Sequence, residues 1–246
     1  MSPGGGARYA AAFFDLQLDF ARRGAPLSGA PWPRALLDYT NFYIRFGCGF
    51  DFDPAQPVWR DYLTGVTGTQ ADAAWTYDFY LARAAAMTGP PVVATFGCFA
   101  YARLPDDRLR LHFVNAEPDG GSPLAKERQA ARRADLAALF GHVRATYGEA
   151  SLRVVGGSWL YNLEAYRRLF PPSYLASARV SPRRFRRMSL WGQFLDRHGA
   201  VKQAMTDPFR ERLARVTDVD ALDACFPLAA LTVEAPVSAF YAFYGV

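Results

Sequence analysis

The chain has 246 residues, of which 51% are hydrophobic, 15% aromatic and 21% charged. This much apolar surface excludes a disordered tail, and three cysteines are too few for a disulfide framework. No apolar run reaches the ~18 residues that a membrane span requires. The N-terminus lacks a basic stretch followed by an apolar core. We therefore expect a cytoplasmic protein without membrane association.

The net charge of +5 is unevenly distributed along the chain. Residues 1–120 carry 10 Arg against 12 acidic residues, whereas residues 121–246 carry 18 Lys and Arg against 11 acidic residues. The densest basic segment is Arg183-Arg184-Phe185-Arg186-Arg187. Arginines can hold phosphate groups through bidentate hydrogen bonds, but a charge run is also typical of a solvated surface. Nucleic acid is not an expected partner, because no recognised binding motif is present.

Residues 1–88 are predicted to be mostly helical. Apolar residues recur there at three- and four-residue spacing, and Gly and Pro separate the segments. The four expected helices are Tyr9–Arg23, 34–46, Asp53–Leu63 and Asp72–Met87.

The pattern changes after Pro91. Two strands are expected at Val92–Tyr101 and Arg108–Asn115, where Leu109 and Leu111 alternate with polar residues. Further on we expect a helix over Ser122–Thr146, a strand over Leu152–Val155, a tight turn at Gly156-Gly157-Ser158, a helix to Phe170, an extended basic segment at 179–188, short helices and a last strand at Leu231–Glu234. The predicted fold class is α+β, with a helical region over 1–88 followed by a small mixed α/β domain over 89–246.

Residues that could carry chemistry are few. His112 lies on a predicted strand just before Glu117, and a histidine can act as a general base near neutral pH. A strand histidine can equally well bond to a neighbour. The turn at Gly156 and Gly157 presents backbone N–H groups that could hold an oxyanion, or it could simply cap a helix through Ser158. We expect the three cysteines to be buried, and no metal-ligand spacing is present.

Several short motifs occur in a particular order in the second half. They are Leu111-His112-Phe113-Val114, Ser122-Pro123-Leu124, Gly157-Ser158-Trp159-Leu160 and Leu169-Phe170-Pro171-Pro172-Ser173-Tyr174-Leu175. This order resembles the C-terminal part of bacterial GNAT-like acyltransferase-domain proteins, over roughly residues 90–246. The family's acetyl-CoA signature is absent. Residues 156–163 are also similar to a proteobacterial family without assigned function.

The resemblance implies an N-acyltransferase that uses acyl-CoA. On this interpretation His112 or Glu117 deprotonates the amine, and Tyr161 or Ser158 protonates the leaving thiolate. Gly156 and Gly157 would supply backbone N–H groups at the cofactor, and Arg183, Arg184, Arg186 and Arg187 would hold the 3′-phosphate of CoA. The alternative is a non-catalytic binding or accessory protein that acts through an aromatic and Arg-rich interface.

Overall fold

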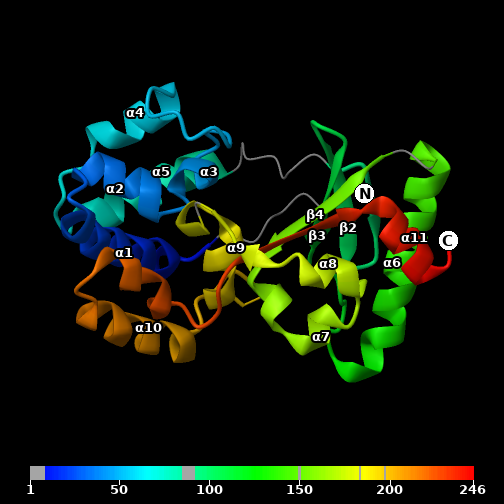
Figure 1. The fold of residues 1–246 in the computed structure, drawn as a ribbon. Coiled ribbons are helices and arrows are strands. Elements are labelled where there is room, and N and C mark those ends of the chain that lie inside the picture. Colours follow the sequence, from blue (N-terminus) through cyan, green and yellow to red (C-terminus); the bar gives the residue numbers. More distant parts are fainter. Residues whose placement is uncertain (1–8, 85–91, 149–150, 183, 197) are drawn as a thin grey trace. The chain divides into compact units, whose positions relative to one another are not determined.

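The computed structural model describes residues 9–84, 92–148, 151–182, 184–196 and 198–246. The chain forms two compact units (Figure 1), which we call the helical unit and the sheet unit. The helical unit comprises Met1–Met87 and Pro182–Ala229, and the sheet unit comprises Thr88–Ser181 and Ala230–Val246. The predicted α+β class is confirmed. The first boundary between the units, after Met87, lies close to the point where the sequence pattern changes. Residues 182–229, however, belong to the helical unit, whereas the sequence analysis placed them in the second domain.

The helical unit is built from short helices around an aromatic core. In the core Phe20 lies within 6 Å of the rings of Trp191, Phe209 and Phe226. The elements in chain order are α1 (Ala11–Ser28), α2 (Trp32–Tyr39), α3 (Phe42–Arg45), α4 (Pro57–Thr64), α5 (Asp72–Ala84), η3 (Arg184–Arg186), α9 (Met188–Trp191), η4 (Gly192–Phe194), α10 (Gln203–Arg215) and η5 (Val219–Cys225).

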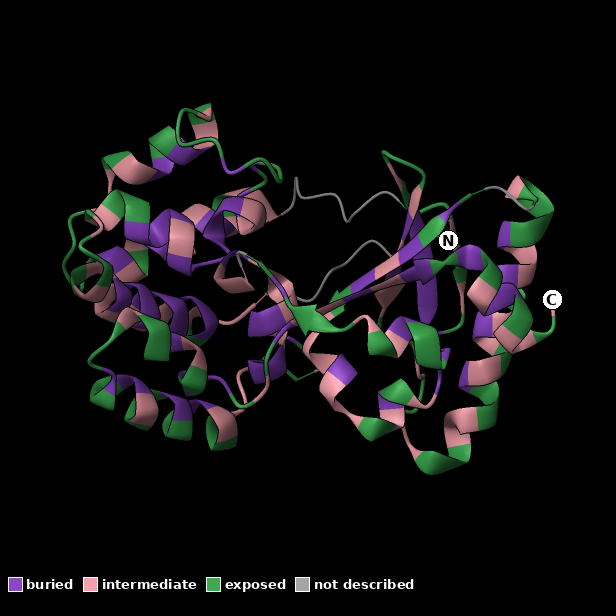
Figure 2. Ribbon diagram, in the orientation of Figure 1, coloured by how far each residue is buried: buried purple, intermediate pink, exposed green. Residues whose placement is uncertain are grey.

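Local hydrogen bonds divide the helix that was expected over 34–46. The Thr40 hydroxyl donates to the Leu36 carbonyl at 2.6 Å, and the Asn41 N–H donates to Gln17 Oε1 at 2.8 Å. Because side chains take over these main-chain groups, α2 ends and α3 begins there. α1, by contrast, continues beyond its expected end to Ser28 with Pro26 inside it. The buried residues of α10 recur every three or four positions between exposed ones (Figure 2), as expected for a helix with one face on a core.

The sheet unit contains a six-stranded mixed sheet in the order β1-β2-β3-β4-β6-β5. Only β3 and β4 are parallel neighbours, and the crossover between them includes α6. The elements are β1 (Ala94–Phe96), β2 (Phe99–Leu104), β3 (Arg108–Phe113), η1 (Lys126–Arg128), α6 (Gln129–Tyr147), β4 (Arg153–Ser158), η2 (Trp159–Asn162), α7 (Glu164–Arg167), α8 (Pro172–Ala176), β5 (Arg179–Val180), β6 (Leu231–Pro236) and α11 (Val237–Tyr244).

One face of this sheet forms the core of the unit. Alternate strand residues such as Tyr101, Leu111 and Val154 pack with side chains from α6, α7, α8 and α11 in one hydrophobic cluster. The predicted direction of Leu109 and Leu111 is confirmed, since both belong to this cluster. Arg110 and His112, which alternate with these leucines along β3, lie on the opposite face.

Three boundaries differ from the sequence prediction. The strand expected over Val92–Tyr101 is a hairpin, because the chain turns at Gly97 with φ 54°. A Cβ at that glycine would lie 2.2 Å from Asp135 Oδ2, so a side chain does not fit at this turn. The long helix begins at Gln129 and not at Ser122. Gly156 and Gly157 lie within β4 because β6 pairs with them, and so form no tight turn. None of the described helices is long and apolar enough to cross a membrane.

Candidate functional site

The parallel strands β3 and β4 separate towards their carboxyl ends. Their pairing covers Arg108 with Arg153, Leu109 with Val154 and Arg110 with Val155. Beyond that point β3 stays paired with β2 as far as Phe113, while β4 stays paired with β6 as far as Ser158. Among the described residues, the last three of each strand therefore have no strand partner on the edge that faces the other. We call this place the β3–β4 opening. Ligands of α/β sheets commonly bind outside the carboxyl ends of strands where neighbouring connections diverge.

His112 lies on the β3 side of the opening. It is opposite Ala100 of β2 and two residues beyond Arg110. Gly157 is two residues beyond Val155, so the register puts His112 and Gly157 at the same level and on the same face, opposite the core. Burial, followed by the charge of Arg110, lowers the pKa of His112. Its Nε2 is buried and makes no hydrogen bond within the described part of the chain.

The glycines of β4 differ in what surrounds them. Gly157 is exposed, and a Cβ there would meet no atom within 4 Å. A Cβ on Gly156 would lie 2.0 Å from Tyr161 Oη and 2.4 Å from Tyr174 Oη. β4 thus has open space on one face and two tyrosine hydroxyls in contact with it on the other. Ser158 accepts a hydrogen bond from the Leu160 N–H at 3.1 Å, so it caps η2.

Tyr161 lies in the core of the sheet unit with 3% of its surface exposed. Its hydroxyl hydrogen-bonds to the Tyr174 hydroxyl at 2.9 Å. Burial and the neighbouring Tyr174 raise the pKa of Tyr161 well above its usual value. Tyr161 therefore stays protonated at neutral pH, with its hydroxyl against Gly156.

Glu117 lies in the loop after β3 and is held by two arginines. Its carboxylate forms ion pairs with Arg128 and, at 2.5 Å, with Arg132. Arg132 is 7% exposed and also pairs with Asp135 at 3.0 Å. No described contact joins Glu117 to His112, and both of its carboxylate oxygens are engaged.

The arginines around Glu117 were not singled out in the sequence analysis. Arg128, the last residue of η1, is followed at spacings of four and three residues by Arg132 and Asp135 in the first turns of α6, which puts the three on one side of the helix. This spacing was the one sequence feature from which the cluster could have been predicted. Cys98 lies in the same cluster, where its thiol contacts Arg132 and burial raises its pKa. Cys48, Cys98 and Cys225 are all buried, as expected.

The basic segment lies in the helical unit. Arg184 forms a bidentate ion pair with Asp223, and Arg186 pairs with Asp38. Arg187 is half-buried, and Arg183 is outside the described residues. The two arginines with defined pairs thus already have carboxylate partners.

Comparison with known proteins adds no relative for this chain. No family model, curated protein or solved structure matches it. The described residues contain no group of His, Cys, Asp and Glu side chains arranged to hold a metal ion. The candidate site therefore consists of His112 and the unpaired strand edges of the β3–β4 opening. The expected site residue Tyr161 is not part of it, because Tyr161 belongs to the core on the other face of the sheet.

Proposed function

We propose that the sheet unit is a CoA-dependent N-acyltransferase-like enzyme whose site is the β3–β4 opening. The observation that carries the proposal is the end of strand pairing at Arg110 and Val155, with His112 and the open position at Gly157 just beyond it. An extended chain with amide groups can bond to an open strand edge as an added strand would. The pantetheine arm of an acyl-CoA is such a chain.

The proposed reaction is direct attack of an amine on the thioester carbonyl. His112 accepts the proton that the amine loses, and its lowered pKa favours the neutral imidazole that this requires. Backbone N–H groups of β4 at the opening stabilise the oxyanion. The C–S bond then breaks, and the thiolate leaves and takes a proton from water. Tyr161 cannot supply this proton, because its buried hydroxyl contacts the core face of β4 at Gly156, opposite the face that carries His112 and Gly157. Glu117 has no free oxygen for this chemistry, so the role of base goes to His112.

The phosphates of CoA have no assigned site in this proposal. Arg184 and Arg186 already pair with Asp223 and Asp38, and a phosphate would have to displace those carboxylates. The proposal rests on the sheet unit alone.

The test has two parts. Acetyl-CoA at 100 times its Kd should raise the free energy of unfolding by about 2.7 kcal/mol. With a panel of primary amines, release of free thiol should then be detected. His112→Gln should lower the rate by about 10²- to 10⁴-fold and leave the stabilisation by acetyl-CoA unchanged.

Two results would count against the proposal. Absence of any stabilisation at millimolar acetyl-CoA would exclude CoA binding and favour the alternative of a binding or accessory protein. If the His112→Gln variant binds acetyl-CoA and releases free thiol at the wild-type rate, His112 has no role in the mechanism. The largest fully buried side chains are Trp, Tyr and Phe, so many of the aromatic rings pack in the cores of the two units and not at an interface.

A further inference from the structure

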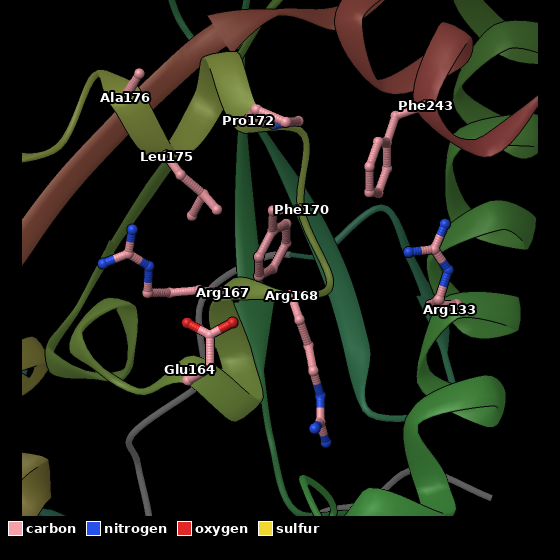
Figure 3. Close-up of a pocket in the computed structure, with 9 residues that line it drawn as sticks. All are labelled: Arg133, Glu164, Arg167, Arg168, Phe170, Pro172, Leu175, Ala176 and Phe243. Atoms are coloured by element: carbon pink, nitrogen blue, oxygen red, sulfur yellow. The ribbon is translucent and has the colours of Figure 1, made fainter.

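A cavity lies in the helical layer of the sheet unit, among residues of α6, α7, α8 and α11 (Figure 3). Its volume is about 540 Å³, within the range of small-molecule sites. It contains none of the residues assigned to the β3–β4 opening.

The charge of the lining is strongly positive. Arg133, Arg167 and Arg168 contribute three guanidinium groups, and Glu164 is the one acidic residue of the lining. Within the described part of the chain none of the three arginines forms an ion pair. Arg133 contacts the ring of Phe243 at 4.8 Å. Arg168 donates to the Leu124 carbonyl at 3.3 Å, and its Nε is buried without a partner among the described residues. With three arginines and one glutamate, the lining carries a net charge of 3 − 1 = +2.

The middle of the cavity is apolar. Phe170, which is 2% exposed, lies between the side chains of Arg167 and Arg133 in Figure 3. Leu175 and Phe243 line the same cavity. An apolar surface next to unpaired guanidinium groups is suited to a ligand with an anionic head and a hydrocarbon tail. Arginine holds a carboxylate through two parallel hydrogen bonds, and such charge-assisted bonds are stronger than neutral ones.

We propose that this cavity binds a small amphipathic carboxylate. The carboxylate lies on Arg167 or Arg133 at the rim, and the hydrocarbon part covers Phe170, Leu175 and Phe243. The excess of guanidinium groups selects an anion, and the apolar centre selects against small inorganic ions. This binding does not depend on acyl transfer at the β3–β4 opening.

The test uses the full chain and three probes that separate head from tail. Sodium octanoate has both, acetate has the head alone and 1-octanol has the tail alone. Titration calorimetry below the micelle-forming concentration should show saturable binding of octanoate with one site. Acetate and octanol should each bind at least about 10-fold more weakly, because each lacks one set of contacts.

The variants Arg167→Gln and Arg133→Gln should each weaken octanoate binding by about 10-fold. Phe243→Ala should weaken octanoate and leave acetate unchanged. Arg108→Gln is the matched control, because this half-buried arginine of β3 pairs with the exposed Asp106 and is not part of the cavity lining. Since Arg167 is exposed, its variant keeps the test usable if Arg133→Gln fails to fold.

The proposal is overturned if octanoate shows no saturable binding, if octanol binds as tightly as octanoate, or if Arg167→Gln binds octanoate like the wild type. A failure of this test leaves the acetyl-CoA experiment unaffected, since the two use different probes and different residues.

Discussion

Replacement of Gly156 by alanine should destabilise the sheet unit through a steric conflict on one face of β4. The new methyl group would lie 2.0 Å from Tyr161 Oη, 2.4 Å from Tyr174 Oη and 2.9 Å from Tyr161 Cζ. Both rings are at least 97% buried and pack against Phe170, so neither can move freely. Overpacking of this kind costs about 1–3 kcal/mol. Loss of the hydrogen bond between the two hydroxyls costs about 1–3 kcal/mol more, so we expect a total of about 2–6 kcal/mol.

The neighbouring glycine is the matched control for this substitution. Gly157→Ala meets no atom within 4 Å and should change the free energy of unfolding by no more than about 1 kcal/mol. Urea unfolding measures the change in the free energy of unfolding for each variant. Hydrogen exchange of the β4 and β6 amides then distinguishes the sheet unit from the helical unit. In a background with Tyr161→Phe and Tyr174→Phe, most of the cost of Gly156→Ala should disappear, because both hydroxyls are gone. Equal effects of the alanine at 156 and at 157 would refute the reasoning.

Two further predictions concern charged and titratable groups of the sheet unit. Arg132→Met leaves Asp135 and Glu117 without their shared buried partner and should lower the free energy of unfolding, measured by thermal unfolding, by about 3 kcal/mol. Arg103→Met is the control: it removes an exposed ion pair with Asp107 and should lower that free energy by less than about 1 kcal/mol. Similar losses in the two variants would contradict the burial argument. Because the pKa of His112 is lowered in the folded state, the unfolded chain binds this proton more readily. Its contribution to stability should therefore be complete above pH 6.5 and should decline as the pH falls through the lowered pKa. His112→Gln should flatten this part of the urea-unfolding profile, and an unchanged profile would exclude His112 as its cause.

Local patterns were enough to predict several elements of the fold. The alternation of Leu109 and Leu111 with Arg110 and His112 identified β3 and its two faces, because the side-chain period of a strand is two. The spacing of apolar residues identified α1, α5 and α6.

The parts of the site that could not be predicted depend on distant partners. Gly156 and Gly157 have the composition of a turn, but they pair with Val233 and Thr232 about 75 residues later and so become strand. Gly97 turns the chain at a point that local apolar content does not reveal. The opening itself follows from where the pairing of β3 and β4 stops, and no local pattern in the sequence encodes that position.

The interruption of the sheet unit by residues 182–229 has a consequence for how the chain folds during synthesis. β4 emerges long before β6, the strand that pairs with it, and β6 also pairs with β5. Until residues 230–246 are made, β4 has one edge uncovered and α6 lacks the ring of Phe240, which stacks on Phe140 at 4.4 Å. An uncovered strand edge promotes association with other chains. We therefore expect nascent or truncated chains that end before residue 230 to be prone to aggregation, and the final strand to set the rate at which the sheet closes.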